Sequence, residues 1–139
     1  MLKLLTITLL LILDQLTKHA PFWEKSCNPY ISWSIPLHGP LLWLLIIIAF
    51  GFLFYTLKKN NFPYSLLLIT TGALGNIIDR LHLNCVIDFI SITFPFAIPF
   101  IGNTFPTFNL ADTFITIGAI LFIYQIYRND KQEIKKGDT

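Results

Sequence analysis

The stretch Gly72-Ala73-Leu74-Gly75-Asn76-Ile77-Ile78-Asp79-Arg80 decides how this chain folds. On a helix Asn76, Asp79 and Arg80 are spaced i, i+3 and i+4, so their side chains project from one face. The two glycines of the stretch allow the backbone of a neighbouring helix to approach closely. The stretch therefore predicts a closely packed helix with a polar face. That face is either a seam that holds a helix bundle together or part of a functional site, and this segment alone leaves both open.

The composition of the whole chain indicates where such a helix lies. Of its 139 residues, 54% are hydrophobic and 13% are charged, whereas a soluble domain has about 25% charged residues. A chain with so few polar residues cannot cover a globule in water. The composition therefore predicts an integral membrane protein.

Four segments are apolar enough to cross a bilayer as helices, which takes about 20 residues, with a range of roughly 17–25. They run approximately over residues 1–17, 40–57, 62–78 and 108–127. In the first segment Asp14 interrupts the apolar run and no small-residue cleavage site follows it. We therefore expect a retained helix there and not a cleaved signal peptide.

A fifth apolar stretch, residues 89–107, is interrupted by Pro95, Pro99, Gly102 and Pro106. Proline lacks a backbone N–H and breaks helices. Irregular backbone at membrane depth is tolerated only where protein or water satisfies its polar groups. We expect this stretch to form an interfacial or re-entrant loop.

The basic residues predict the orientation of an all-α protein with four transmembrane helices. The positive-inside rule assigns the side with more Lys and Arg to the cytoplasm, which puts both termini and the loop between the second and third segments there and leaves the other loops extracytoplasmic. We expect a four-helix transmembrane domain, residues 1–127, and a basic cytoplasmic tail, residues 128–139. The cytoplasmic side holds Lys3, Lys58, Lys59, Arg128, Lys131, Lys135 and Lys136, and the other side holds Lys18, Lys25 and Arg80.

Four aspartates, Asp14, Asp79, Asp88 and Asp112, fall at or beside helix ends on the predicted extracytoplasmic side. A carboxylate at the centre of a bilayer costs roughly 2.5–3.5 kcal/mol. A cluster on one face therefore needs a reason, and chemistry on acidic side chains is the leading one. Nothing in the sequence indicates nucleic-acid binding.

The fourth helix opens with Phe108-Asn109-Leu110-Ala111-Asp112, where Asn109 and Asp112 share a face. Asn109 is suited to cap the helix, because its side-chain oxygen can accept an unpaired backbone N–H. Capping does not account for Asp112 one turn further in. Asp88 is similarly unexplained, since it lies between bulky apolar side chains in Val86-Ile87-Asp88-Phe89.

Cys27 and Cys85 fall on the same predicted side, where an oxidising compartment permits a disulfide. Two cysteines in separate loops do not establish a bond, and unpaired side chains are the favoured interpretation. His19, His38 and His82 share this side but lack the local spacing of a zinc or iron site. We expect neither a metal nor another cofactor.

Taken together, these motifs resemble one known family, the lipoprotein signal peptidases (signal peptidase II), which are membrane aspartyl proteases. The resemblance spans residues 13–112, and four motifs in the right order make it specific. The outer loop Cys27–Ser34 is similar to another family motif, with Tyr30 and Ser34 in place of the expected glycines. The four motifs are Leu13–Lys18 for the first helix, Gly75–Arg80 for GNxxDR, Val86–Phe89 for VxDF and Phe108–Asp112 for FNxAD.

The resemblance implies removal of the signal peptide from diacylglyceryl-modified prolipoproteins, with the cut on the amino side of the lipidated cysteine. It implies a multi-pass protein of the bacterial cytoplasmic (inner) membrane with an extracytoplasmic active site, and no nucleic-acid partner. The implied partners are lipid-modified prolipoprotein signal peptides and membrane lipids. Asp88 and Asp112 match the catalytic pair, Asn28, Asn76, Arg80 and Asn109 match supporting polar residues, and Asp14 and Asp79 match structural or auxiliary acidic positions.

The residue types agree with this chemistry. Two carboxyls close together in a site of low dielectric share a proton and titrate as a pair, so one acts as general base and the other as proton donor. A small ion-coupled transporter is the alternative, but its carboxylates would lie nearer the midplane. A non-enzymatic assembly factor would use the polar face only for packing. We favour the hydrolase.

Overall fold

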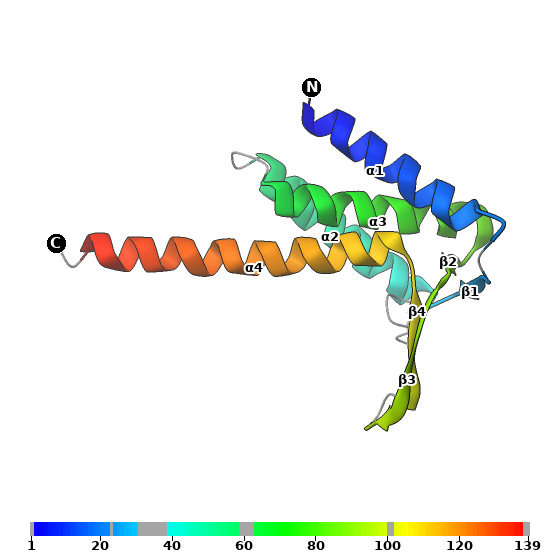
Figure 1. Ribbon diagram of the computed structural model, residues 1–139. Helices are drawn as coiled ribbons and strands as arrows, with labels where there is room; N and C mark the ends of the chain where they lie inside the picture. The colour runs from blue at the N-terminus through cyan, green and yellow to red at the C-terminus, as the bar shows by residue number, and fades with distance from the viewer. Residues whose placement is uncertain (1, 23, 31–38, 59–62, 100–101, 138–139) are drawn as a thin grey trace.

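Four α-helices lie along one another in this computed structural model, which describes residues 2–22, 24–30, 39–58, 63–99 and 102–137. Two small antiparallel sheets lie at the end of the bundle where α4 begins (Figure 1). Successive helices run in opposite directions. The elements are α1 (Leu2–His19), β1 (Ser26–Asn28), α2 (Pro40–Lys58), α3 (Tyr64–Leu83), β2 (Val86–Asp88), β3 (Ile90–Ile98), β4 (Gly102–Phe108) and α4 (Leu110–Gly137).

Helices occupy all four predicted apolar segments, and local sequence explains several of their ends. Pro40 begins α2, where its missing N–H costs no helical hydrogen bond. α3 runs on to Leu83, five residues beyond the predicted end at residue 78. It stops because Asn84 adopts a left-handed conformation (φ 59°) and donates its backbone N–H to the Arg80 carbonyl, a usual form of C-cap.

Small residues bring the helices close together, as the sequence predicted. α3 and α4 form the most extensive helix contact. Gly72 of α3 lies so near the Ala111 carbonyl that a side chain would collide with it, and Gly118 of α4 lies against the Ser65 carbonyl in the same way. Gly75 leaves the space that the carboxylate of α1 residue Asp14 fills.

The distribution of polarity is the reverse of that in a water-soluble protein. Among the described residues, the buried side chains comprise seven hydrophobic and twelve polar or charged ones, and long rows of leucine and isoleucine on α1 and α4 are exposed. An apolar solvent outside the bundle accounts for this pattern. In the described part of the chain one helical segment, Leu110–Gln132, meets a length and hydropathy criterion for crossing a membrane, and Pro40–Gly51 is a shorter apolar helix.

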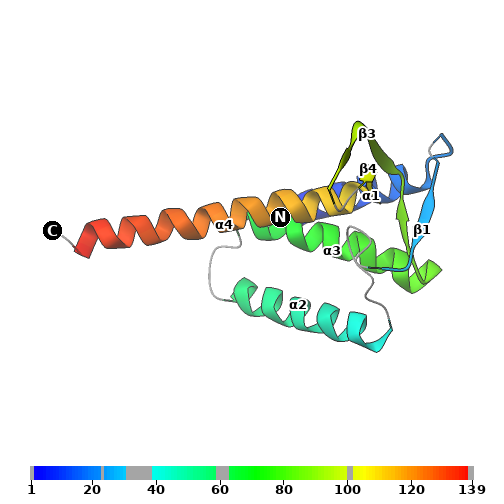
Figure 2. The same ribbon diagram turned by 90° about the horizontal axis from the view of Figure 1, so that it is seen from below.

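The predicted loop over residues 89–107 is wrong, because β3 and β4 form a hairpin, and the expectation of an all-α fold is wrong for the same reason. The strands pair antiparallel, with Ile92 opposite Phe105 and Thr93 opposite Thr104. Isoleucine, threonine and phenylalanine favour strands. The prolines exclude a helix but not a two-stranded hairpin, in which both strands are edges. The hairpin projects away from the helices (Figures 1 and 2).

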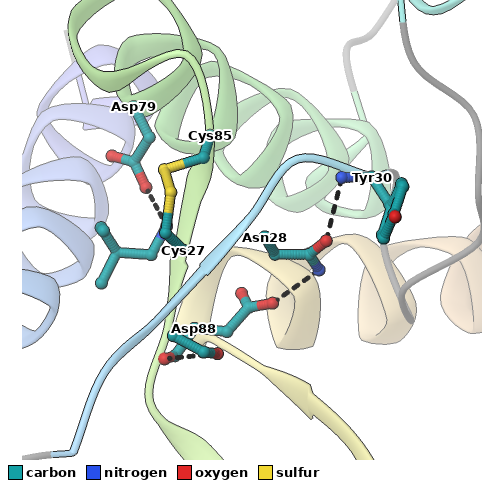
Figure 3. The surroundings of a disulfide bond; sticks show 8 residues. Cys27, Asn28, Tyr30, Asp79, Cys85 and Asp88 are labelled. Carbon is teal, nitrogen blue, oxygen red and sulfur yellow. Dashed lines mark hydrogen bonds between the residues drawn. A yellow bond between two sulfur atoms is a disulfide. The ribbon is translucent and has the colours of Figure 1, made fainter.

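The second sheet corrects the interpretation of the cysteines. β1 pairs antiparallel with β2, with Cys27 opposite Ile87, and Cys27 forms a disulfide with Cys85 (Figure 3). The sheet brings the two Cα atoms to 5.5 Å, within the usual range for a disulfide. The favoured unpaired state is therefore wrong, because strand pairing joins two loops that are 58 residues apart.

Packing at the glycines predicts one stability difference. We expect Gly72→Ala to destabilise the fold by about 1–3 kcal/mol, because the added methyl meets backbone that cannot move aside. Thermal unfolding in detergent micelles measures the change. Gly51→Ala is the matched control, since a methyl at Gly51 has open space in the described structure. Equal melting temperatures for Gly72→Ala and the parent would contradict the packing account.

Candidate active site

The four aspartates singled out in the sequence are all buried. Their residual exposures are 1% for Asp14, 2% for Asp79, 1% for Asp88 and 3% for Asp112. They come from four elements, α1, α3, β2 and α4, and hydrogen bonds join them into one network. A buried carboxylate without partners is costly, so the partners of each one decide what this end of the bundle does.

Lys18 supplies the positive charge for two of the carboxylates. Its ammonium Nζ lies 2.9 Å from Asp14 Oδ2 and 3.0 Å from Asp79 Oδ2, and it donates a hydrogen bond of 3.0 Å to Asn76 Oδ1. Lys18 is fully buried, at 1% exposure. Sequence reasoning counted Lys18 as an extracytoplasmic charge within the first-helix motif and gave it no site role, although its i, i+4 spacing from Asp14 is the usual signal of a helical ion pair.

Asp14 and Asp79 hold elements together. Asp14 Oδ1 accepts the backbone N–H of Ala111 at 2.9 Å, which is one of the amides left unpaired at the start of α4. Asp79 Oδ2 accepts the N–H of Ile87 at 3.1 Å and so ties β2 to α3. Gln15, which the sequence analysis did not single out, donates to Asp79 Oδ1 at 3.1 Å. These contacts agree with a structural role for both aspartates.

Asp88 is held by two amides. Asn28 Nδ2 donates to Asp88 Oδ2 at 2.8 Å, and Asn109 Nδ2 donates to Asp88 Oδ1 at 2.9 Å. Burial, together with the negative charge of Asp112, raises the pKa of Asp88 to about 6, against the opposing effect of the two amide hydrogen bonds and of Lys18. Asp88 therefore takes up a proton more readily than an ordinary aspartate.

Asn76 and Asn109 connect Asp88 to Asp112. Asn76 Nδ2 donates to Asp112 Oδ1 at 2.9 Å. Asn109 caps α4, because its Oδ1 accepts the backbone N–H of Asp112 at 2.9 Å, and its Nδ2 donates to Asp88. Asn109 Nδ2 also lies 3.1 Å from Asn76 Oδ1. The predicted cap is thus confirmed, and the same side chain touches both aspartates of the predicted pair.

Arg80 holds the start of the predicted outer-loop motif. Its Nη1 donates to the Asn76 carbonyl at 3.1 Å and its Nη2 to the Tyr30 carbonyl at 2.7 Å. Its Nε is buried and has no hydrogen-bond partner among the described residues. Residues 31–34 of the motif, and likewise His38, lie outside the described residues. Within the described part of the chain, no cluster of three or more His, Cys, Asp or Glu is arranged to hold a metal.

Two apolar grooves reach the network. One, of about 120 Å³, runs between α2 and the α3–α4 pair. Its walls are aliphatic and aromatic except for Asn76 and Arg80. The other, of about 230 Å³, lies between β4 and α4 and has Asp112 in its wall. It is otherwise lined by Phe105, Phe108, Thr113, Thr116 and Ile117.

Comparison with solved structures places this fold among those of bacterial membrane enzymes. One such enzyme, determined by the in meso method at 2.3 Å resolution, superposes with a TM-score of 0.73 at 28% identity, over 94% of this chain and 90% of that one. A second, at 1.9 Å, gives 0.67 at 29% identity over 89% and 91%. The sequence model of the signal peptidase (SPase) II family matches residues 6–128. The chain belongs to that family, which confirms the resemblance.

Curated relatives carry the same family name. A lipoprotein signal peptidase of Chlamydia felis is 43% identical over 100 residues, covering 68% of this chain and 57% of the relative. One of Acinetobacter baylyi is 38% identical over 97 residues, covering 68% and 51%, and one of Listeria monocytogenes is 31% identical over 119 residues, covering 80% and 72%. The chain thus spans just over half the length of the first two. None of these relatives supports the transporter alternative.

The buried ion pairs predict a large stability change. We expect Lys18→Met to destabilise the protein by about 3–5 kcal/mol, because it leaves Asp14 and Asp79 buried without their cation. Thermal unfolding in detergent measures this, with Lys25→Met, at an exposed position, as the control. Neutralising both carboxylates together with Lys18 should recover part of the loss. A Lys18→Met protein as stable as the control would show that the pairs contribute little.

Proposed function

We propose that this chain is a membrane aspartyl endopeptidase that removes the signal peptide from diacylglyceryl-modified prolipoproteins, cutting on the amino side of the lipidated cysteine. The observation that carries the proposal is the arrangement of Asp88 and Asp112, two buried carboxylates that adjoining amides link. Asn109 Nδ2 donates to Asp88, Asn76 Nδ2 donates to Asp112, and Asn109 Nδ2 also donates to Asn76 Oδ1. Membership of the signal peptidase II family supports the choice of substrate.

The chemistry requires one proton shared between the two carboxyls. In the free protein below pH 6 that proton resides on Asp88, whose pKa burial raises to about 6. Asp112 then accepts a proton from a water as the water attacks the scissile carbonyl, and Asp88 donates its proton to the carbonyl oxygen. Collapse of the tetrahedral intermediate breaks the C–N bond as the proton gained by Asp112 passes to the leaving nitrogen and one hydroxyl of the intermediate returns a proton to Asp88. Asn28 and Asn76 hold the carboxylates in place by the hydrogen bonds described above.

The grooves suit the two apolar parts of such a substrate. The groove between α2 and α3 has an apolar wall that ends at Asn76 and Arg80, which fits a signal helix whose last residues approach the carboxyls. The groove beside Phe105 and Asp112 is apolar as well, and it fits an acyl chain. Each buried CH₂ contributes about 0.8 kcal/mol, so the lipid would hold the scissile bond in register.

Orientation in the membrane follows from the same proposal. All four helices would span the bilayer of the bacterial cytoplasmic membrane, with both termini in the cytoplasm and the carboxyls at the extracytoplasmic face. α4 has 28 residues, which is about 42 Å of helix against a hydrocarbon core of about 30 Å. Its basic end, from residue 128 onward, would therefore extend past the catalytic domain, residues 1–127, into the cytoplasm.

The proposed roles predict the effect of two neutral substitutions. We expect Asp88→Asn and Asp112→Asn each to lower kcat/KM on a diacylglyceryl-modified precursor at least about a thousandfold, because an amide can neither accept nor donate the shared proton. Cleavage by the purified protein in one detergent is the measurement. Asp130→Asn, at an exposed position of α4, is the matched control and should keep the parental rate.

Two results would contradict this assignment. If either variant retained near-parental turnover while folding normally, the pair would not be catalytic. If a matched precursor without the diacylglyceryl group were cleaved equally well, the lipid would not belong to the recognised substrate. We expect that precursor to be cleaved at least about tenfold less efficiently, which corresponds to roughly 1.4 kcal/mol of transition-state stabilisation.

The raised pKa of Asp88 predicts a pH profile. Below about pH 6 Asp88 keeps the proton that the pair shares, and above it the proton is lost. We therefore expect kcat/KM to fall as the pH rises through about 6, by about tenfold for each further unit. Rates on the lipidated precursor from about pH 5 to about pH 8 test this. A profile that is flat over that interval would be incompatible with a shared proton on Asp88.

A further inference from the structure

The strand that carries Asn28 has few attachments of its own. β1 is three residues long, and among the described strands it pairs only with β2. Ser26 Oγ donates to the Asp88 carbonyl at 3.3 Å and lies 3.1 Å from Thr107 Oγ1 of β4, and the Tyr30 carbonyl accepts from Arg80. A two-stranded sheet of this length is marginally stable at best. The ladder alone is therefore a weak means of holding the Asn28 amide at Asp88.

The partner strand, in contrast, is fixed to the helices. The Ile87 N–H donates to Asp79 Oδ2 at 3.1 Å, and the Ile87 carbonyl accepts from Asn109 Nδ2 at 3.2 Å. Cys85 directly follows Asn84, the residue that ends α3, and is 4% exposed. β2 and Cys85 thus form a rigid frame against which β1 lies.

The disulfide joins β1 to that frame one residue before Asn28. Figure 3 shows the Cys27–Cys85 bond beside the hydrogen bond from Asn28 to Asp88. The Asn28 oxygen also accepts the backbone N–H of Tyr30 at 2.9 Å, which fixes which end of the amide faces Asp88. Without the bond, 58 residues of chain would separate the two cysteines, and closing such a loop is entropically unfavourable.

We infer that the Cys27–Cys85 disulfide is a positioning element of the catalytic site, which keeps the Asn28 amide on the Asp88 carboxylate. The inference rests on the proposed function. Reduction by a dithiol transfers two electrons and two protons to the bond, leaves two thiols and converts the reductant to its own disulfide. Cys27 is the exposed partner and the one a reductant reaches. Cleavage efficiency thus depends on the oxidation state of a bond that takes no part in the chemistry.

Reduction has a specific expected signature. Asn28 stabilises the ionised form of Asp88, so its displacement raises the pH at which activity is lost. The other charges that act on Asp88 come from the helices and not from β1: Asp112 of α4, Lys18 of α1 and Arg80 of α3. A reduced protein should therefore show the pH profile of Asn28→Ala. A protein that is merely less stable would keep the parental profile.

The experiment measures kcat/KM on the lipidated precursor with and without dithiothreitol. It compares the parent, Cys27→Ser/Cys85→Ser, Asn28→Ala and the variant that carries all three substitutions. We expect reduction to lower kcat/KM about tenfold, the change that follows loss of one hydrogen bond to a charged group. We also expect reduction to have no further effect on Asn28→Ala, because interacting sites are not additive. The serine variant should not respond to dithiothreitol, which assigns the effect to this bond.

The outcomes separate this inference from the proposed function. If the oxidised parent cleaves and the reduced parent cleaves equally well, the inference is overturned and the proposed function stands. The same holds if the effect of reduction adds to the effect of Asn28→Ala. An oxidised parent that does not cleave overturns the function. Amide hydrogen exchange over residues 26–30 then decides the positioning role, since we expect it to become at least about tenfold faster on reduction. Unchanged exchange overturns the inference.

Discussion

The ammonium of Lys18 is the charge on which this end of the bundle depends. It lies against Asp14 of its own helix and Asp79 of α3, and all three side chains are almost completely buried. A buried pair of carboxylates without a cation would be strongly destabilising. Their ion pairs therefore join α1 to α3 beside the proposed catalytic carboxyls.

The same ammonium orients the polar groups next to it. Lys18 donates to Asn76 Oδ1, which leaves Asn76 Nδ2 to donate to Asp112. The amide could not serve Asp112 in the opposite orientation, because Lys18 would then face an N–H₂ group that accepts no hydrogen bond. The charge that stabilises the bundle thus also determines which donor the proposed catalytic carboxyl receives.

Fold and site share single side chains elsewhere as well. Asn109 caps α4 through its oxygen and binds Asp88 through its nitrogen, and Gly75 leaves the space into which Asp14 reaches. A short sequence motif can therefore support both the fold and the site. A substitution at Asn109 would remove a helix cap and a carboxylate partner together, so its effect on stability and its effect on chemistry cannot be separated.

Much of the fold and of the candidate site was predictable from local pattern. Apolar runs indicated the four helices, the spacing of Asn76, Asp79 and Arg80 indicated a shared face, and Asn109 was identified as a cap. These features depend on neighbours within one helical turn, whose geometry is regular. The orientation of the helices in a membrane stays a prediction, since it depends on a solvent outside the protein.

Only the tertiary structure decided the partners that come from distant parts of the chain. The choice of Asp79 and Asn76 as partners of Lys18 and the bond between Cys27 and Cys85 join residues whose separation in sequence carries no signal of contact. The prolines of residues 89–107 illustrate the limit, because they exclude a helix but are compatible with either a loop or an edge strand. Sequence determined which chemical groups lie at each helix end, and tertiary packing decided which of them touch, because contact depends on register and distance between elements.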